Sequence, residues 1–244
     1  MGLNDITPIQ RRKMTLFFMI DNSGSMSGQK IGSVNDAIKN VLPILADISD
    51  NNSDAEINVA ALIFSTEVNW LYDTPKDVKD FIWQDVGVDG MTNLGAACLE
   101  LSKKLSRSGG FMDSPSGCYA PAIILLSDGG PTDNFEAGLK VLQANSWFKS
   151  AIKIAIAIGE DADKQVLAQF TGSSEAVIVV HNIDALKKMI RVIAVTSSQI
   201  GSKSTTSAAI TKQEQVVEEI NREVADTQGA ENAATTGDSY DEWD

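Results

Sequence analysis

Residues 17–28 read FFMIDNSGSMSG and join an apolar run directly to a cluster of small polar side chains. The apolar run covers residues 14–20 and stops at Asp21, and Ser23 and Ser25 follow at alternate positions. A short, continuous apolar run predicts a strand that is buried on both faces of a sheet. Its abrupt end in a carboxylate and two hydroxyls predicts a polar site where that strand ends.

The rest of the chain alternates apolar strands with amphipathic helices. Further strands are predicted over residues 57–64, 122–126, 152–158 and 176–180, and helices over residues 30–48, 94–105, 134–148, 163–170 and 184–197. Residues 67–72 are a plausible hairpin partner of the second strand, and Pro43 is expected to kink or restart the first helix. We therefore predict an α/β, Rossmann-like, doubly wound fold. Its mostly parallel sheet has one antiparallel edge strand and helices on both faces.

The composition changes near residue 200. We predict an N-terminal extension (1–13), a folded domain (14–199) and an acidic, largely flexible tail (200–244). The tail holds three basic and ten acidic residues, which is over half of the net charge of −13. Apolar side chains at helical spacing predict one helix in it, over residues 208–225. That helix would pack on the folded domain or on a partner.

Charge and hydropathy exclude some classes of function. A net charge of −13 argues against nucleic-acid binding, which needs clustered lysines and arginines. No segment approaches the 18 or so apolar residues of a membrane span, so we expect a cytoplasmic protein. Cys98 lies on the apolar stripe of a helix and is interpreted as a buried hydrophobic residue, and Cys118 as a free thiol. His181, the only histidine, is interpreted as structural.

Three loops near the predicted carboxyl edge of the sheet carry small oxygen donors. The first holds Asp21, Ser23 and Ser25, the second holds Thr92 within GMTNLG, and the third holds Asp128 within SDGG. Hydroxyl and carboxylate oxygens without clustered His or Cys favour Mg²⁺ or Mn²⁺ over Zn²⁺. Taken alone, the first loop favours a helix N-cap. The two distant loops in register with it favour a metal site.

This combination of loops resembles the metal-ion-dependent adhesion site of von Willebrand factor A domains, over about residues 14–197. The stretches IDNSGSMSGQKI, GMTNLGAAC and LLSDGGPTD further resemble the TerY-like group of bacterial tellurium-resistance proteins. Gly130 departs from that pattern, which has a larger and often acidic residue there. The long acidic tail is a second departure.

The resemblance implies roles for five residues. Ser23 and Ser25 would ligate the ion directly, Thr92 would do so in the ligand-ready state, and Asp21 and Asp128 would act mostly through water. Neutral hydroxyl ligands leave much of the cation's charge uncancelled, so a carboxylate from another protein can fill one position. Gly24 is expected to let the backbone turn closely around the ion.

The leading hypothesis is a non-enzymatic, Mg²⁺-dependent protein-interaction module of a bacterial stress-response system of the tellurium-resistance or phage-defence type. Its partner would present Asp or Glu to the metal, and an operon-encoded kinase or phosphatase is the expected kind of partner. The alternative is a Mg²⁺-dependent phosphohydrolase, a class that usually has a second aspartate where Ser23 stands. The acidic stretch DSYDEWD (238–244) offers a further carboxylate source, in cis or in trans, although a solvated tail is the favoured explanation of it.

Overall fold

The computed structural model describes residues 11–112, 115–180, 183–201 and 211–234. The strands are β1 (Arg12–Asp21), β2 (Ala55–Phe64), β3 (Val68–Trp70), β4 (Lys76–Asp77), β5 (Ala122–Ser127), β6 (Ile152–Ile158) and β7 (Val177–Val180). The helices are α1 (Gln29–Asn51), α2 (Leu94–Lys104), α3 (Phe135–Ala144), α4 (Ser146–Ser150), α5 (Lys164–Thr171), α6 (Ile183–Gly201) and α7 (Lys212–Ala234). Two single 3₁₀ turns, η1 (Gly24–Met26) and η2 (Ser174–Ala176), complete the described elements.

The described strands form one seven-stranded sheet with the order β3-β2-β1-β5-β6-β7. Strands β2, β1, β5, β6 and β7 run parallel, and β3 and the two-residue β4 pair antiparallel with β2. The predicted fold class is therefore confirmed. In the register of β1 and β5, Ile20 lies opposite Leu126. Asp21 and Ser127, the last residues of these two strands, therefore meet at the same edge.

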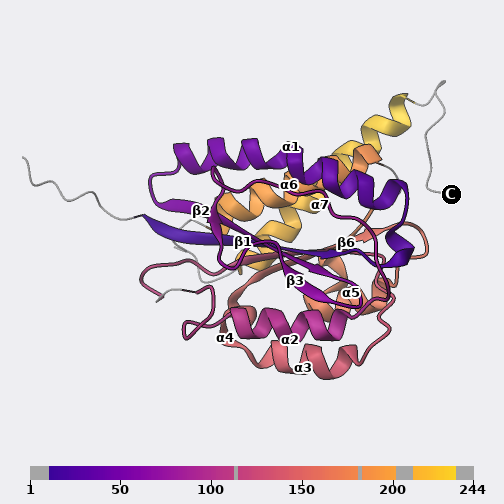
Figure 1. Ribbon diagram of the computed structural model, residues 1–244. Coiled ribbons are helices and arrows are strands. Elements are labelled where there is room, and N and C mark those ends of the chain that lie inside the picture. Colours follow the sequence, from indigo (N-terminus) through magenta and orange to yellow (C-terminus); the bar gives the residue numbers. More distant parts are fainter. Residues whose placement is uncertain (1–10, 113–114, 181–182, 202–210, 235–244) are drawn as a thin grey trace, which may run out of the picture.

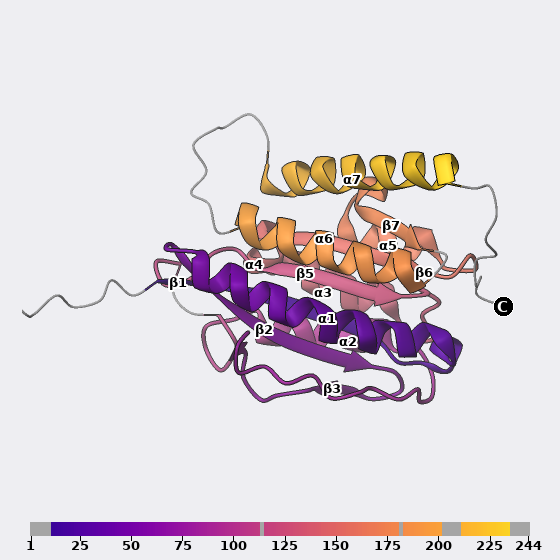
Figure 2. The ribbon, with the colours of Figure 1, turned by 90° about the horizontal axis from the view of Figure 1, so that it is seen from above.

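Helices cover both faces of the sheet (Figure 1). Helices α1, α6 and α7 lie on one face, and α2 to α5 lie on the other (Figures 1 and 2). Phe18 and Ile20 of β1 pack in the core on the α1 and α6 face of the sheet. Phe17 and Met19 pack in the core on the α2 and α3 face. Successive side chains of a strand point to opposite faces, and here both faces are buried. The continuous apolar run of β1 follows from that burial.

One predicted helix is divided into two, and another continues through its proline. The helix expected over 134–148 is divided at Asn145, whose side chain accepts hydrogen bonds from the amides of Trp147 and Phe148 and so begins α4. Its amide group also donates to the carbonyl of Leu105 after α2, which fixes the break by a contact distant in sequence. Helix α1 does not restart at Pro43, and a kink there stays a prediction. The buried side chains on either side of Pro43 stabilise the helix despite the missing amide hydrogen bond.

The helix predicted over residues 208–225 corresponds to α7, which begins at Lys212, continues beyond the predicted end to Ala234 and packs on the folded domain. Val216, Val217 and Ile220 join the core on the α1 and α6 face. Near its start, the Gln213 side chain accepts from the amide of Lys153 in β6 (2.6 Å) and donates to the carbonyl of Lys153 (2.8 Å). Strand β7 pairs with β6 only from Ala155 onward. Gln213 therefore takes the place of a neighbouring strand at this edge.

Both cysteines of the chain are buried. Cys98 is fully buried, as predicted, and burial raises the pKa of its thiol, with a smaller contribution from the charge of Asp133. Cys118 forms no disulfide with Cys98, and it is buried as well. None of the helices in the described ranges is long and apolar enough to cross a membrane. His181 and the stretch 238–244 lie outside the described residues.

Candidate metal centre

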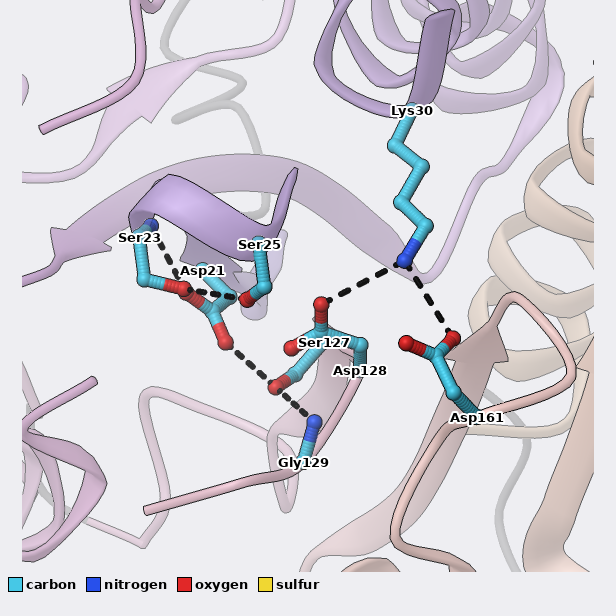
Figure 3. A network of polar contacts seen from close by, with 8 residues as sticks. All are labelled: Asp21, Ser23, Ser25, Lys30, Ser127, Asp128, Gly129 and Asp161. Carbon is cyan, nitrogen blue, oxygen red and sulfur yellow. Dashed lines mark hydrogen bonds and ion pairs between the residues drawn. The ribbon is translucent and has the colours of Figure 1, made fainter. Parts of the chain in front are cut away.

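The candidate site lies where β1 and β5 end side by side. After β1 the chain passes to α1 on one face of the sheet, and after β5 it passes to α3 on the other. Loops that leave adjacent parallel strands in opposite directions open a crevice at the sheet edge, where α/β proteins place their ligand sites. Asp21 is the last residue of β1, and Asp128 follows β5 directly (Figure 3).

Both carboxylate oxygens of Asp21 accept hydrogen bonds from the protein. The amide of Ser23 donates to Oδ1 (2.9 Å), and the hydroxyl of Ser127 donates to Oδ2 (2.6 Å). The Ser127 hydroxyl in turn accepts from the amide of Gly129 (2.7 Å). Ser127 is not among the predicted site residues. Its place at the end of an apolar strand beside Asp128 is the signal in the sequence that could have identified it.

Asp21 is costly to keep charged in this position. Its side chain is fully buried, and this burial raises its pKa above the usual aspartate value. The hydrogen bonds from Ser127 and Ser23 offset part of that effect, and the nearby negative charge of Asp128 adds to it. A cation bound close to Asp21 and Asp128 would relieve both the burial of charge and the repulsion.

Ser23 and Ser25 present their hydroxyls to each other across the 3₁₀ turn η1. Their Oγ atoms lie 3.1 Å apart, beside Asp21 (Figure 3). Ser23 is buried and Ser25 is exposed, so the pair spans from the interior to the surface. Helix α1 begins only at Gln29 and has Gly28 as its N-cap residue. The interpretation of Asp21 and the serines as caps of that helix is therefore wrong.

The loop that carries Thr92 is hydrogen bonded to the first loop. The amide of Gly24 donates to the carbonyl of Gly90 (3.1 Å), and the amide of Asp89 donates to the carbonyl of Asn22 (2.7 Å). Gly90 has a φ of +56°, and a Cβ there would lie 2.1 Å from Oγ1 of Thr66. A Cβ on Gly24 would make only an ordinary contact of 3.5 Å. A side chain at Gly90 would therefore collide with Thr66. The close turn of the backbone around the ion at Gly24 stays a prediction.

Thr132 and Asp133 hold Thr92 and the start of α2 in place. The amide of Thr92 donates to Oγ1 of Thr132 (3.1 Å), and its carbonyl accepts from the amide of Thr132 (2.8 Å). The two carboxylate oxygens of Asp133 accept from the amides of Gly95 (2.9 Å) and Ala96 (2.8 Å), at the start of α2.

Thr132 and Asp133 directly precede Asn134, the N-cap residue of α3. Thr132 lies forty residues from Thr92 in the sequence, so no local sequence pattern predicts this contact.

Lys30 is a further charged residue that the sequence did not single out. It lies in the first turn of α1, and its Nζ lies 3.5 Å from Oδ2 of Asp128 and 3.4 Å from Oδ1 of Asp161 (Figure 3). The site therefore contains two buried carboxylates and one ammonium group within the network that Figure 3 draws.

The donor set fits a hard divalent cation. Hydroxyl and carboxylate oxygens are the ligands that Mg²⁺ and Mn²⁺ prefer. Mg²⁺ also retains several bound waters, and the small hydroxyl ligands leave room for them. Across the described residues, no group of three or more His, Cys, Asp or Glu side chains is arranged to hold a metal. A metal at this edge would therefore depend on hydroxyls. The structure brings Asp21, Ser23, Ser25 and Asp128 together, and hydrogen bonds join the loop of Thr92 to them.

Comparison with known proteins identifies the same fold. The family model for the von Willebrand factor type A domain matches residues 15–192. The pilus adhesin SpaC from Lactobacillus rhamnosus GG in its open conformation superposes with a TM-score of 0.60 at 16% identity, over 75% of this chain and 30% of that one. The ArnB paralog VWA2 from Sulfolobus acidocaldarius gives 0.55 at 21% identity, over 75% and 45%.

A third similar structure is proximal thread matrix protein 1 from the mussel byssus, with a zinc-occupied MIDAS motif. It gives a TM-score of 0.56 at 16% identity, over 76% of this chain and 48% of that one. This chain thus matches less than half the length of each of these three proteins. No curated protein matches it.

Proposed function

This chain belongs to the von Willebrand factor type A domain family, and we propose that it is a Mg²⁺-dependent module that captures an acidic side chain of a protein partner. Domains of this family commonly bind proteins through the metal of a metal-ion-dependent adhesion site, and they are generally not enzymes. Within this proposal, Ser23, Ser25 and Thr92 hold the ion directly. Asp21 and Asp128 act through water.

The facing hydroxyls of Ser23 and Ser25 are the observation that carries this proposal. They are 3.1 Å apart, and the buried Asp21 carboxylate lies next to them with both oxygens already accepting hydrogen bonds. Asp21 is therefore suited to contact the ion through water, and the neutral hydroxyls are suited to ligate it directly. When bound, a divalent cation supplies a positive charge that these hydroxyls do not cancel, so an incoming carboxylate is attracted.

The same geometry disfavours the phosphohydrolase alternative. A nucleophilic aspartate needs a free oxygen that faces the substrate, whereas both oxygens of Asp21 accept hydrogen bonds within the protein. Ser23 also stands where that class usually has its second aspartate. We therefore propose a binding role and no catalytic residue.

The biological setting is proposed on the three motif stretches alone. The TerY-like resemblance of these stretches supports a role in a bacterial stress response of the tellurium-resistance or phage-defence type, in the cytoplasm. An operon-encoded kinase or phosphatase with an exposed Asp or Glu is then the expected partner. The acidic stretch 238–244 stays a candidate carboxylate source in cis or in trans.

The proposal is tested by Mn²⁺ and Mg²⁺ titration of the full chain by calorimetry, followed by partner capture with Mg²⁺ or EDTA. We expect the double variant Ser23→Ala with Ser25→Ala to lose metal binding and capture together. Ser27→Ala changes an exposed serine of the same loop and should retain both. Equal Mn²⁺ binding by the double variant, or capture that survives EDTA, would contradict the proposal.

A further inference from the structure

We propose that Lys30 and Asp161 regulate the affinity of this site for its cation, with Lys30 competing for Asp128 and Asp161 restraining that competition. The inference rests on the proposed function, because it concerns the metal that Ser23 and Ser25 would hold. It adds two residues that lie outside the predicted ligand set.

The geometry places one ammonium group between two carboxylates. Lys30 reaches from α1 to Asp128, which follows β5, and to Asp161, which follows β6 (Figure 3). The Lys30 side chain is only 14% exposed and that of Asp128 only 7%, whereas that of Asp161 is 75% exposed. The contact with Asp128 is therefore sheltered from water, and the contact with Asp161 lies at the rim.

The backbone around Lys30 leaves space for this arrangement. Gly159 has a φ of +94°, and a Cβ there would lie 3.1 Å from Nζ of Lys30 and 2.8 Å from Oδ1 of Asp161. Any larger residue would push against both charged groups. Asp128 is also fixed, because its carbonyl accepts from the amide of Asp163 (2.7 Å). The ammonium group thus lies between the loops that follow β5 and β6, which this hydrogen bond joins.

Lys30 opposes metal binding for an electrostatic reason. An ammonium and a divalent cation are both attracted to Asp128, and each raises the cost of bringing in the other. Charges a few ångströms apart are poorly screened, since the Debye length is about 8 Å at physiological ionic strength. Removal of the Lys30 charge should therefore tighten cation binding.

Asp161 should act in the opposite direction. It shares the ammonium group with Asp128, so part of the Lys30 charge is neutralised at the rim. Without Asp161, Lys30 would pair with Asp128 alone, and the site would also lose one negative charge. Cation binding should then weaken. Opposite signs for the two residues distinguish regulation from a merely structural ion pair, whose loss would act in one direction for both.

Helix α1 supplies a matched control in Lys39. It pairs with Asp85 at 2.6 Å, but these side chains are 44% and 61% exposed. Nine residues of helix separate Lys39 from Lys30, which is about 13 Å along the axis. Lys39→Met removes the same charge from the same helix and leaves the site unchanged.

The test is calorimetric titration of the full chain with Mn²⁺. Lys30→Met should tighten Mn²⁺ binding about tenfold, which is about 1.4 kcal/mol, and Lys39→Met should stay within about twofold. Asp161→Asn should weaken binding about threefold, and Lys30→Arg, which keeps the charge, should resemble the unchanged protein. Thermal unfolding in EDTA verifies that each variant folds.

The outcomes separate this inference from the proposed function. If Ser23→Ala with Ser25→Ala binds Mn²⁺ as well as the unchanged chain, the proposed site itself is wrong. If that double variant loses binding while Lys30→Met matches Lys39→Met, the site stands and the regulatory role of Lys30 is overturned. Weaker binding in both Lys30→Met and Asp161→Asn would reduce the pair to a structural contact.

Discussion

Polar groups gather at both ends of the central strand β1, but the two ends use opposite chemistry. At its amino end, Arg11 donates to the carbonyls of Ser49 (2.6 Å) and Asn52 (2.9 Å). Arg12 donates to the carbonyl of Cys118 (2.6 Å), and its guanidinium lies 3.9 Å from the centre of the Tyr119 ring. At the carboxyl end, acidic and hydroxyl oxygens gather around Asp21.

The arginines at the amino end stabilise the fold. The carboxylates at the other end keep a buried negative charge that a cation can neutralise. The arginines at the amino end pair cationic donors with backbone acceptors, so they join β1 to two neighbouring segments. The carboxyl end instead keeps two buried carboxylates, with Lys30 as the cation that faces Asp128 in Figure 3. Stability and metal affinity should therefore respond to mutations at different ends of the same strand.

Asp21→Asn should give the largest difference between the effect on metal affinity and the effect on stability. We expect Mn²⁺ affinity to fall about 100-fold, because the residue that orders the ligands loses its charge. Stability in EDTA should stay level or rise. Burial raises the pKa of Asp21, so the folded chain holds that proton more tightly than the unfolded chain, and ionisation at neutral pH lowers stability. The amide has no such cost.

Calorimetric Mn²⁺ titration and urea unfolding in EDTA measure the two effects of Asp21→Asn. A marked loss of stability in EDTA would show that Asp21 supports the fold much as the arginines do. The contrast between the two ends of β1 would then fail.

Arg12→Ala should produce the reverse pattern. It removes hydrogen bonds to the carbonyls of Pro115 and Cys118 and the contact with the Tyr119 ring. We expect a loss of about 2 kcal/mol in the free energy of unfolding, with Mn²⁺ affinity unchanged within about twofold. Arg107→Ala removes an arginine elsewhere and controls for the general change in charge. A large loss of Mn²⁺ affinity in Arg12→Ala would mean that the two ends are coupled through the strand.

Asp133→Ala should affect both properties to a moderate degree. Asp133 accepts from the amides of Gly95 and Ala96 in the first turn of α2, which begins two residues after Thr92. It therefore supports both this helix and the loop that carries Thr92. We expect a loss of about 1 kcal/mol in stability and a fall of about threefold in Mn²⁺ affinity. Glu136→Ala, an exposed acid in the first turn of α3, is the matched control. Equal effects of the two changes would refute a positioning role for Asp133.

The sequence predicts those parts of this site whose evidence is local. The apolar run before Asp21 indicates a buried strand, and the alternation of Ser23 and Ser25 indicates two hydroxyls on one side of a turn. The two other loops could be placed beside them because parallel strands end at a common edge.

The partners that fix this geometry could not be predicted in the same way. Thr132, Lys30 and Ser127 each act on a residue from forty to more than a hundred positions away. The same applies to the break at Asn145, which depends on carbonyls at the end of α2. Such contacts follow from the packing of loops in three dimensions, for which one sequence contains no periodic signal.

Ser127→Ala should give an effect no larger than that of Asp133→Ala, and Ser49→Ala at the amino end is its matched partner. The Ser49 hydroxyl accepts from the amide of Ile57 (3.0 Å), whereas the Ser127 hydroxyl donates to Asp21 (2.6 Å). Each change should cost about 1 kcal/mol in stability. Only Ser127→Ala should weaken Mn²⁺ binding, by about threefold.

The pH dependence of Mn²⁺ binding sharpens that last contrast. The hydrogen bond from Ser127 lowers the pKa of Asp21 against the effect of burial, so its loss should raise that pKa further. A proton then competes with the cation at a higher pH. As the pH falls from neutrality, Mn²⁺ affinity should decline earlier in Ser127→Ala than in Ser49→Ala. Coincident pH profiles would show that the Ser127 hydroxyl serves only the packing of β5, as the Ser49 hydroxyl serves that of β2.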